Sequence, residues 1–240
     1  MSKIELNKNR RTITKISKPL EEISNNYHIT AKKWSMNDRG FATREAILFW
    51  GLSHTLLKTK LNAINILDVG GGIGMQFCWA YQMYEEMISS WTVLEQESVV
   101  KISSNTNSCE LLKFRSSQSQ KDLRYVYKNK FELVIFMGSL SYMPNYFGLL
   151  EKLSQNCNYF LLSRLPFTRE DNDYAVLDSQ GGHQEIIFSY KKFHNMIKSF
   201  FTIEYESEDE SMPKEKVKVG NRKNFHRGTT MLLKSLKSKF

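Results

Sequence analysis

The segment Asp68-Val69-Gly70-Gly71-Gly72-Ile73-Gly74 places alternating glycines directly after the apolar run 61–69. An apolar run of this length that ends at a glycine cluster is typical of a buried strand. Glycine lacks a Cβ, so its main-chain amides can approach a ligand closely. Residues 75–88 then follow a helical pattern of apolar positions. We therefore predict a strand, a tight loop and a helix whose amino terminus faces a ligand.

Apolar runs alternate with helical patterns along the rest of the chain. Further strands are expected at 91–95, 111–114, 131–137 and 159–163, with helices near 97–104 and 145–154. Beyond Pro166, we expect a polar loop at 168–184, a strand at 185–188, a helix at 190–199, and strands at 200–205 and 229–233 that pair as a hairpin. This order predicts an α/β fold with a Rossmann-like, doubly wound, mostly parallel seven-stranded sheet and an antiparallel edge hairpin.

Composition limits the class of protein. A chain of 240 residues with 41% hydrophobic residues is expected to fold around one core, and no apolar run approaches the length of a membrane span. The amino terminus is polar, without the apolar stretch of a secretory signal. The cysteines, Cys78, Cys109 and Cys157, are odd in number and widely spaced, which indicates neither a disulfide framework nor a zinc site. These features predict a soluble, cytoplasmic protein.

The net charge of +9 is concentrated at the two ends of the chain. Residues 1–19 hold six Lys or Arg and one Glu, residues 214–240 hold nine and one, and the remainder is mildly acidic. This distribution disfavours nucleic acid as the partner, although contact of the basic ends with a polyanion or a membrane surface stays open. We expect a basic extension at 1–34, one catalytic domain at 35–235 and a basic tail at 236–240.

The spacing of the glycine loop argues against a dinucleotide site. A G-x-G-x-x-G fingerprint would need glycine or alanine three residues beyond Gly72, where the chain has Met75. Glu95 ends the expected second strand, 27 residues after Asp68. Rossmann-type folds carry an acidic residue there to accept the two ribose hydroxyls. Glu95 is therefore the expected ribose ligand of a nucleoside.

The pattern D-x-G-x-G-x-G after a strand resembles motif I of class I methyltransferases. Further segments resemble a family of methyltransferases associated with bacterial surface-polysaccharide gene clusters: 66–74, 93–96, 133–142, 160–167 and 187–189. The resemblance covers roughly residues 35–235 and implies S-adenosylmethionine as cofactor. The residues expected to bind it are Asp68, Gly70, Gly71, Gly72, Gly74, Glu95, Gln96, Ser139 and Ser141.

The acceptor side is expected above the carboxyl ends of the strands, where open α/β sheets bind ligands. His183, in the polar loop, is the first candidate for a general base, and Tyr142 and Arg164 are candidates for orienting the acceptor. The family typically has an Arg-Asp pair in its first helix, where this chain offers Arg44-Glu45, and the chain resembles the family's other motifs at 139–142 and at 164–167. It departs from the family at 181–184, Gly-Gly-His-Gln, where the family has an aromatic-proline segment.

These observations predict O-methylation of a small molecule or of a sugar or glycan precursor of surface polysaccharide. Enzymes that methylate nucleobase amino groups commonly have an Asn/Asp-Pro-Pro-Tyr/Phe motif, and cytosine-C5 methyltransferases usually have a Pro-Cys pair. The sequence contains neither. Two alternatives stay open: an RNA-directed methyltransferase that uses the basic ends, and a non-catalytic interaction module. No metal is implied, and the oligomeric state is left open. Trp34, Phe41, Phe49 and Trp50 are expected to form a helical layer over the cofactor or simply to pack in the core.

Overall fold

The computed structural model describes residues 39–106, 109–177, 184–208 and 225–238. The chain divides into two compact units, Met1–Val126 and Tyr127–Phe240. Within the described ranges, no helix is both long enough and apolar enough to cross a bilayer.

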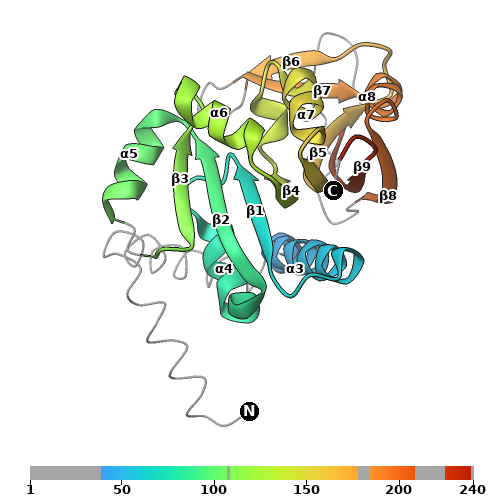
Figure 1. Ribbon diagram of the computed structural model, residues 1–240. Coiled ribbons are helices and arrows are strands. Elements are labelled where there is room, and N and C mark those ends of the chain that lie inside the picture. Colours follow the sequence, from blue (N-terminus) through green and yellow to red (C-terminus); the bar gives the residue numbers. More distant parts are fainter. Residues whose placement is uncertain (1–38, 107–108, 178–183, 209–224, 239–240) are drawn as a thin grey trace. The chain divides into compact units, whose positions relative to one another are not determined.

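The first unit contains parallel strands and the helices that connect them (Figure 1). Its elements are α3 (Arg39–Thr59), β1 (Ile64–Val69), α4 (Met75–Tyr84), the 3-10 turn η1 (Glu85–Met87), β2 (Ile88–Glu95), α5 (Glu97–Thr106), β3 (Leu112–Ser116) and α6 (Gln120–Lys128), which ends just past the boundary. β2 lies between β1 and β3 and runs parallel to both. The register pairs Asp68 with Val93 and Glu95 with Ser116, so the loops after all three strands leave from one edge.

The second unit combines parallel and antiparallel pairing around one long strand. Its elements are β4 (Phe131–Met137), the 3-10 turn η2 (Leu140–Tyr142), α7 (Tyr146–Ser154), β5 (Cys157–Thr168), β6 (Tyr174–Leu177), β7 (Gln184–Ser189), α8 (Tyr190–Ile197), β8 (Phe201–Glu208) and β9 (Phe225–Ser235). β5 is parallel to β4 and β7 and antiparallel to β9. The hairpins β6–β7 and β8–β9 are antiparallel.

The observed mixed α/β architecture, mostly parallel with an antiparallel edge, confirms the expected fold class. The edge hairpin expected from 200–205 and 229–233 is β8–β9. The described residues hold nine strands, which are the eight expected strand segments and β6, so the predicted count of seven was too low. β6 forms inside the expected polar loop by pairing with β7. The sequence prediction also missed α6. That helix starts after Ser119, whose Oγ accepts from the N–H of Asp122 at 3.3 Å, a common cap of a helix amino terminus.

β5 is longer than expected and contains an irregularity that bears on the candidate site. Against β9, Leu162 pairs with Met231 and Leu165 with Thr229, so β5 has one extra residue between these pairs. Arg164 lies in this bulge with φ 58°. Pro166, which has no N–H to donate, falls at the second register shift, so the strand continues past it. Bulges of this kind redirect side chains, often beside functional sites.

The expected aromatic layer is described only in part. Phe49 and Trp50 lie on α3, and the ring of Phe49 packs against Tyr84 of α4, 5.8 Å between centroids. Tyr84 also shares a 2.8 Å hydrogen bond between its hydroxyl and that of Ser53. Trp50 is 36% exposed. Trp34 and the side chain of Phe41 lie outside the described residues.

β4 is buried over nearly its whole length, which makes it a test of the core. Leu133 is 0% exposed, whereas Leu236, after β9, is 60% exposed. Leu133→Ala should lower the free energy of unfolding by about 2–5 kcal/mol, because it removes apolar contacts and leaves a cavity. Leu236→Ala should change it by about 0.5 kcal/mol or less. Urea titrations followed by circular dichroism measure both, and equal losses would contradict the assigned core.

Candidate functional site

The loop after β1 has a backbone that favours glycine at alternate positions. Gly70, Gly72 and Gly74 have φ values of 71°, 58° and 89°, in the left-handed region where a Cβ is strained. The N–H of Gly70 donates to the carbonyl of Leu94 on β2 at 2.9 Å, and that of Gly74 donates to the carbonyl of Gly71 at 3.0 Å. The loop is thus tied to β2 and closes into a tight turn before α4.

Gly71 is required for a different reason, which is its contact with Asp68. A Cβ built on Gly71 would lie 2.3 Å from Asp68 Oδ2 and 2.7 Å from Oδ1. The Asp68 side chain is fully buried beneath the loop, and its Oδ2 accepts a hydrogen bond from Trp91 Nε1 at 3.3 Å. Burial raises the pKa of Asp68 to about 7; the Trp91 hydrogen bond lowers this pKa, and the Glu95 carboxylate raises it. Asp68 therefore supports the loop from below.

Glu95 lies beside the loop, as the sequence predicted. Its Oε2 accepts from the N–H of Gly72 at 3.1 Å, and its Oε1 accepts from the N–H of Gln96 at 2.7 Å. Each carboxylate oxygen can accept more than one hydrogen bond, so both keep capacity for ligand hydroxyls. The structure thus brings together Glu95, Gln96 and the glycine loop at the carboxyl edge of β1 and β2.

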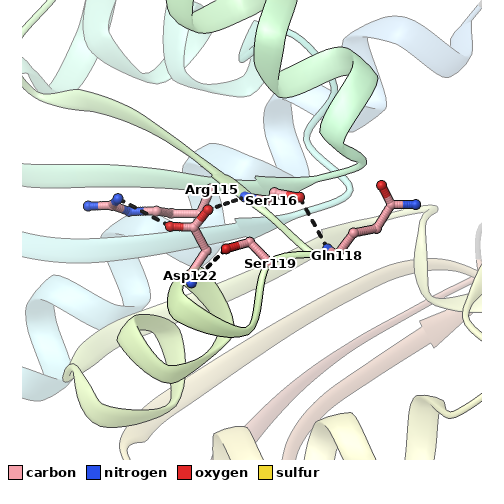
Figure 2. A network of polar contacts seen from close by, with 5 residues as sticks. All are labelled: Arg115, Ser116, Gln118, Ser119 and Asp122. Atoms are coloured by element: carbon pink, nitrogen blue, oxygen red, sulfur yellow. Dashed lines mark hydrogen bonds and ion pairs between the residues drawn. The ribbon is translucent and has the colours of Figure 1, made fainter.

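A polar network that the sequence prediction missed lies at the end of β3, at the same edge (Figure 2). Asp122 accepts from the N–H of Ser116 at 3.0 Å and from Arg115 Nη1 at 3.3 Å. The Oγ of Ser116 accepts from the N–H of Gln118 at 3.2 Å. The N–H of Ser117 donates to the carbonyl of Glu95 at 2.8 Å, which joins this turn to β2. A signal was present in the sequence, the Ser119-x-x-Asp122 spacing of a helix cap.

In the second unit, the turn after β4 places a serine against a carboxylate. Ser141, in η2, is 2% exposed, and its Oγ donates to Oε1 of Glu185 at 3.3 Å. Glu185, on β7, is 4% exposed and was not among the predicted residues. A hydroxyl bonded to a buried carboxylate stabilises that carboxylate and fixes its orientation. Sequence spacing held no sign of this pair, because the two residues are 44 positions apart.

Arg164 lies close to the end of β4. A Cβ built on Gly138, which has φ 87°, would meet Arg164 Cδ at 3.5 Å and Nη1 at 3.6 Å. The Arg164 side chain therefore lies next to Gly138, which is close to Ser139 and Tyr142 in the sequence. Tyr142 is 40% exposed and Ser139 is half-buried. His183 lies outside the described residues, as does the side chain of Arg44.

The contact between Gly71 and Asp68 can be tested by mutation. Gly71→Ala should lower the free energy of unfolding by about 3 kcal/mol, because the new Cβ would overlap the carboxyl and the loop would have to move. Gly72→Ala meets no described atom within 4 Å and should cost about 1 kcal/mol, from its positive φ alone.

A double variant isolates that contact. Asp68→Ala should recover part of the loss in the Gly71→Ala background, so the two effects should not add. The measurement is the free energy of unfolding of all four proteins in urea. Strict additivity would show that the carboxyl does not set the requirement for glycine.

Comparison with known proteins supports the fold. No family model and no curated protein match the sequence. A solved structure of an S-adenosylmethionine-dependent methyltransferase from Clostridium acetobutylicum aligns with a TM-score of 0.54 and 12% identity, over 89% of this chain and 98% of that one. The amino-terminal domain of EvdMO1, crystallised with S-adenosylhomocysteine (SAH) and D-fucose, aligns with a TM-score of 0.52 and 10% identity, over 77% and 82%.

A third structure, from the complex between the Haloferax volcanii methyltransferase activator Trm112 and a methyltransferase, aligns with a TM-score of 0.50 and 12% identity, over 85% of this chain and 96% of that one. Identities this low carry information on the fold and not on the ligand. The chain therefore has the Rossmann-like fold of S-adenosylmethionine-dependent methyltransferases.

Proposed function

We propose that this protein is a methyltransferase that uses S-adenosylmethionine. The observation that carries the proposal is the Glu95 carboxylate at the end of β2, which accepts a hydrogen bond from the N–H of Gly72 in a loop that contains four glycines. A carboxylate in this place suits the vicinal hydroxyls of a ribose, and Met75 in place of a third fingerprint glycine disfavours a dinucleotide. The fold of the compared methyltransferases supports the same assignment.

The residues of the loop fit such a cofactor. A Cβ built on Gly72 meets no described atom within 4 Å, so the backbone there is open to a ligand. Gly70, Gly71, Gly72 and Gly74 would let the chain approach it, and Glu95 and Gln96 would hold its ribose. When bound, the cofactor supplies an electrophilic methyl group on a sulfonium. Asp68, buried below, would act through the loop rather than by touching the cofactor.

We assign the residues at the ends of β4 and β5 to the remaining recognition. Ser139 and Ser141 are proposed cofactor contacts, and Tyr142 and Arg164 are proposed to orient the acceptor. The Arg164 guanidinium would bind an anionic group of that acceptor, because it is a fixed cation with several donors. Glu185, held by Ser141, would bind an acceptor hydroxyl. His183 remains the proposed general base.

The proposed acceptor is the hydroxyl of a sugar or glycan precursor. Methyl transfer from a sulfonium is an in-line displacement, so much of the catalysis comes from positioning the donor and the acceptor. A hydroxyl acceptor gains from a base that removes its proton. The family resemblance and the D-fucose present with the EvdMO1 domain support a sugar.

Glu95→Ala should weaken the binding of S-adenosylmethionine and of SAH by about 1.5–3 kcal/mol, roughly a 10- to 150-fold rise in Kd, because hydrogen bonds to a charged group are lost. Isothermal titration calorimetry measures this change. Glu97→Ala is the matched control, because Glu97 lies on the exposed surface of α5, where it pairs with Lys101 at 2.7 Å. An unchanged Kd in Glu95→Ala would contradict the ribose assignment, and wild-type protein that binds neither ligand would overturn the proposed function.

A panel of hexoses and 6-deoxyhexoses, D-fucose included, each tested as the free sugar and as its phosphate, tests the acceptor. We expect SAH formation above background with at least one member. In that assay His183→Ala should lower kcat by roughly 100-fold or more and leave the Kd for SAH unchanged, because a general base acts on the acceptor. No turnover with any sugar would contradict the sugar proposal, and wild-type kcat in His183→Ala would remove His183 from the mechanism.

A further inference from the structure

Asp68 is a buried carboxyl with one of its oxygens unsatisfied. Its exposed fraction is 0%, and Oδ2 accepts from Trp91 Nε1 at 3.3 Å. Oδ1 has no hydrogen-bond partner among the residues that the structure describes. The backbone of the glycine loop lies directly above, since a Cβ on Gly71 would be 2.4 Å from Asp68 Cγ. The carboxyl is therefore in contact with the loop and shielded from water.

The protonation of such a group is balanced near neutral pH. The pKa of Asp68 is raised to about 7, mainly by burial. The hydrogen bond from Trp91 lowers this pKa by a smaller amount, and the negative charge of Glu95 on β2 raises it. Of the titratable groups on α4, burial raises the pKa of Cys78 to about 11. Burial and the hydrogen bond to Glu85 also raise the pKa of Tyr81, so both groups are neutral. Among the described residues, Glu95 is thus the charged group that acts on Asp68.

A cationic ligand on the loop would change this balance. S-adenosylmethionine carries a sulfonium, an ammonium and a carboxylate and so has one net positive charge, whereas SAH lacks the sulfonium charge. A positive charge near a carboxyl favours its ionised form. Because Asp68 is screened by little more than the loop backbone, it would respond strongly to a charge bound there.

We propose that binding of the cofactor to the glycine loop expels a proton from Asp68 to solvent, so that the buried carboxylate balances the positive charge of the cofactor. This proposal rests on the proposed function. Asp68 is then a positioning residue, because it acts through the loop and its own charge rather than by contact with the reacting atoms. Binding of S-adenosylmethionine would tighten as pH rises toward the pKa of the unliganded protein, about 7, and level off above it.

Calorimetry in two buffers counts the protons released. S-adenosylmethionine is titrated into the whole protein near pH 7 in phosphate and in Tris, which differ in their enthalpy of ionisation. For the wild type, we expect the two binding enthalpies to differ by about half of the difference between the ionisation enthalpies of the buffers. This corresponds to release of about half a proton, because half of the Asp68 carboxyls are protonated at their pKa. The release should be smaller for SAH.

Two variants and one control test the origin of the proton. Asp68→Asn should still bind the cofactor but give equal enthalpies in both buffers, and Glu97→Gln should release protons like the wild type. Trp91→Phe provides a second route if Asp68→Asn fails to fold: without the hydrogen bond that lowers the pKa of Asp68, the pH of maximal release should rise.

The outcomes separate this proposal from the proposed function. Tight binding by the wild type with equal enthalpies in both buffers would overturn the proton release and leave the methyltransferase assignment intact. Proton release that persists in Asp68→Asn, or a pH of maximal release that does not move in Trp91→Phe, would also overturn it. Failure of the wild type to bind either ligand would overturn both proposals.

Discussion

The candidate cofactor loop depends on the close contact between its backbone and the buried carboxyl of Asp68. With the carboxyl atoms 2.3–2.7 Å from where a Cβ of residue 71 would be, only glycine can occupy that position. The contact keeps the backbone low over β1 and frees the N–H of Gly72 to face Glu95. A buried group that supports a loop from below costs free energy when it is charged, and this cost makes its protonation responsive to what binds above it.

The second unit stores strain where the proposed acceptor residues lie. Arg164 has a left-handed backbone inside the β5 bulge, a conformation that costs about 1–2 kcal/mol for a residue with a Cβ. The antiparallel pairing of β5 with β9 on both sides of the bulge maintains this conformation. The result is an arginine side chain directed against Gly138 rather than along the regular alternation of the strand.

Pattern and composition were sufficient to predict the elements with long, continuous apolar runs. β4 has the predicted bounds, because a short, nearly continuous apolar segment between polar turns predicts a strand that is buried on both faces. α6 and β6 were missed for physical reasons. α6 is a short, polar helix whose main signal is its cap, and β6 is stabilised by pairing with β7 rather than by its own propensity.

Some features of the candidate site could also be predicted from the sequence, whereas others became visible only in the structure. The sequence by itself determined the glycine loop and its partner Glu95, because backbone freedom and strand order are local properties that spacing records. Only the tertiary structure decided that Asp68 is buried under Gly71, that Ser141 meets Glu185, and that Asp122 holds the turn after β3. These contacts join different strands, turns and helices, and their burial, distance and charge balance arise only when those elements pack.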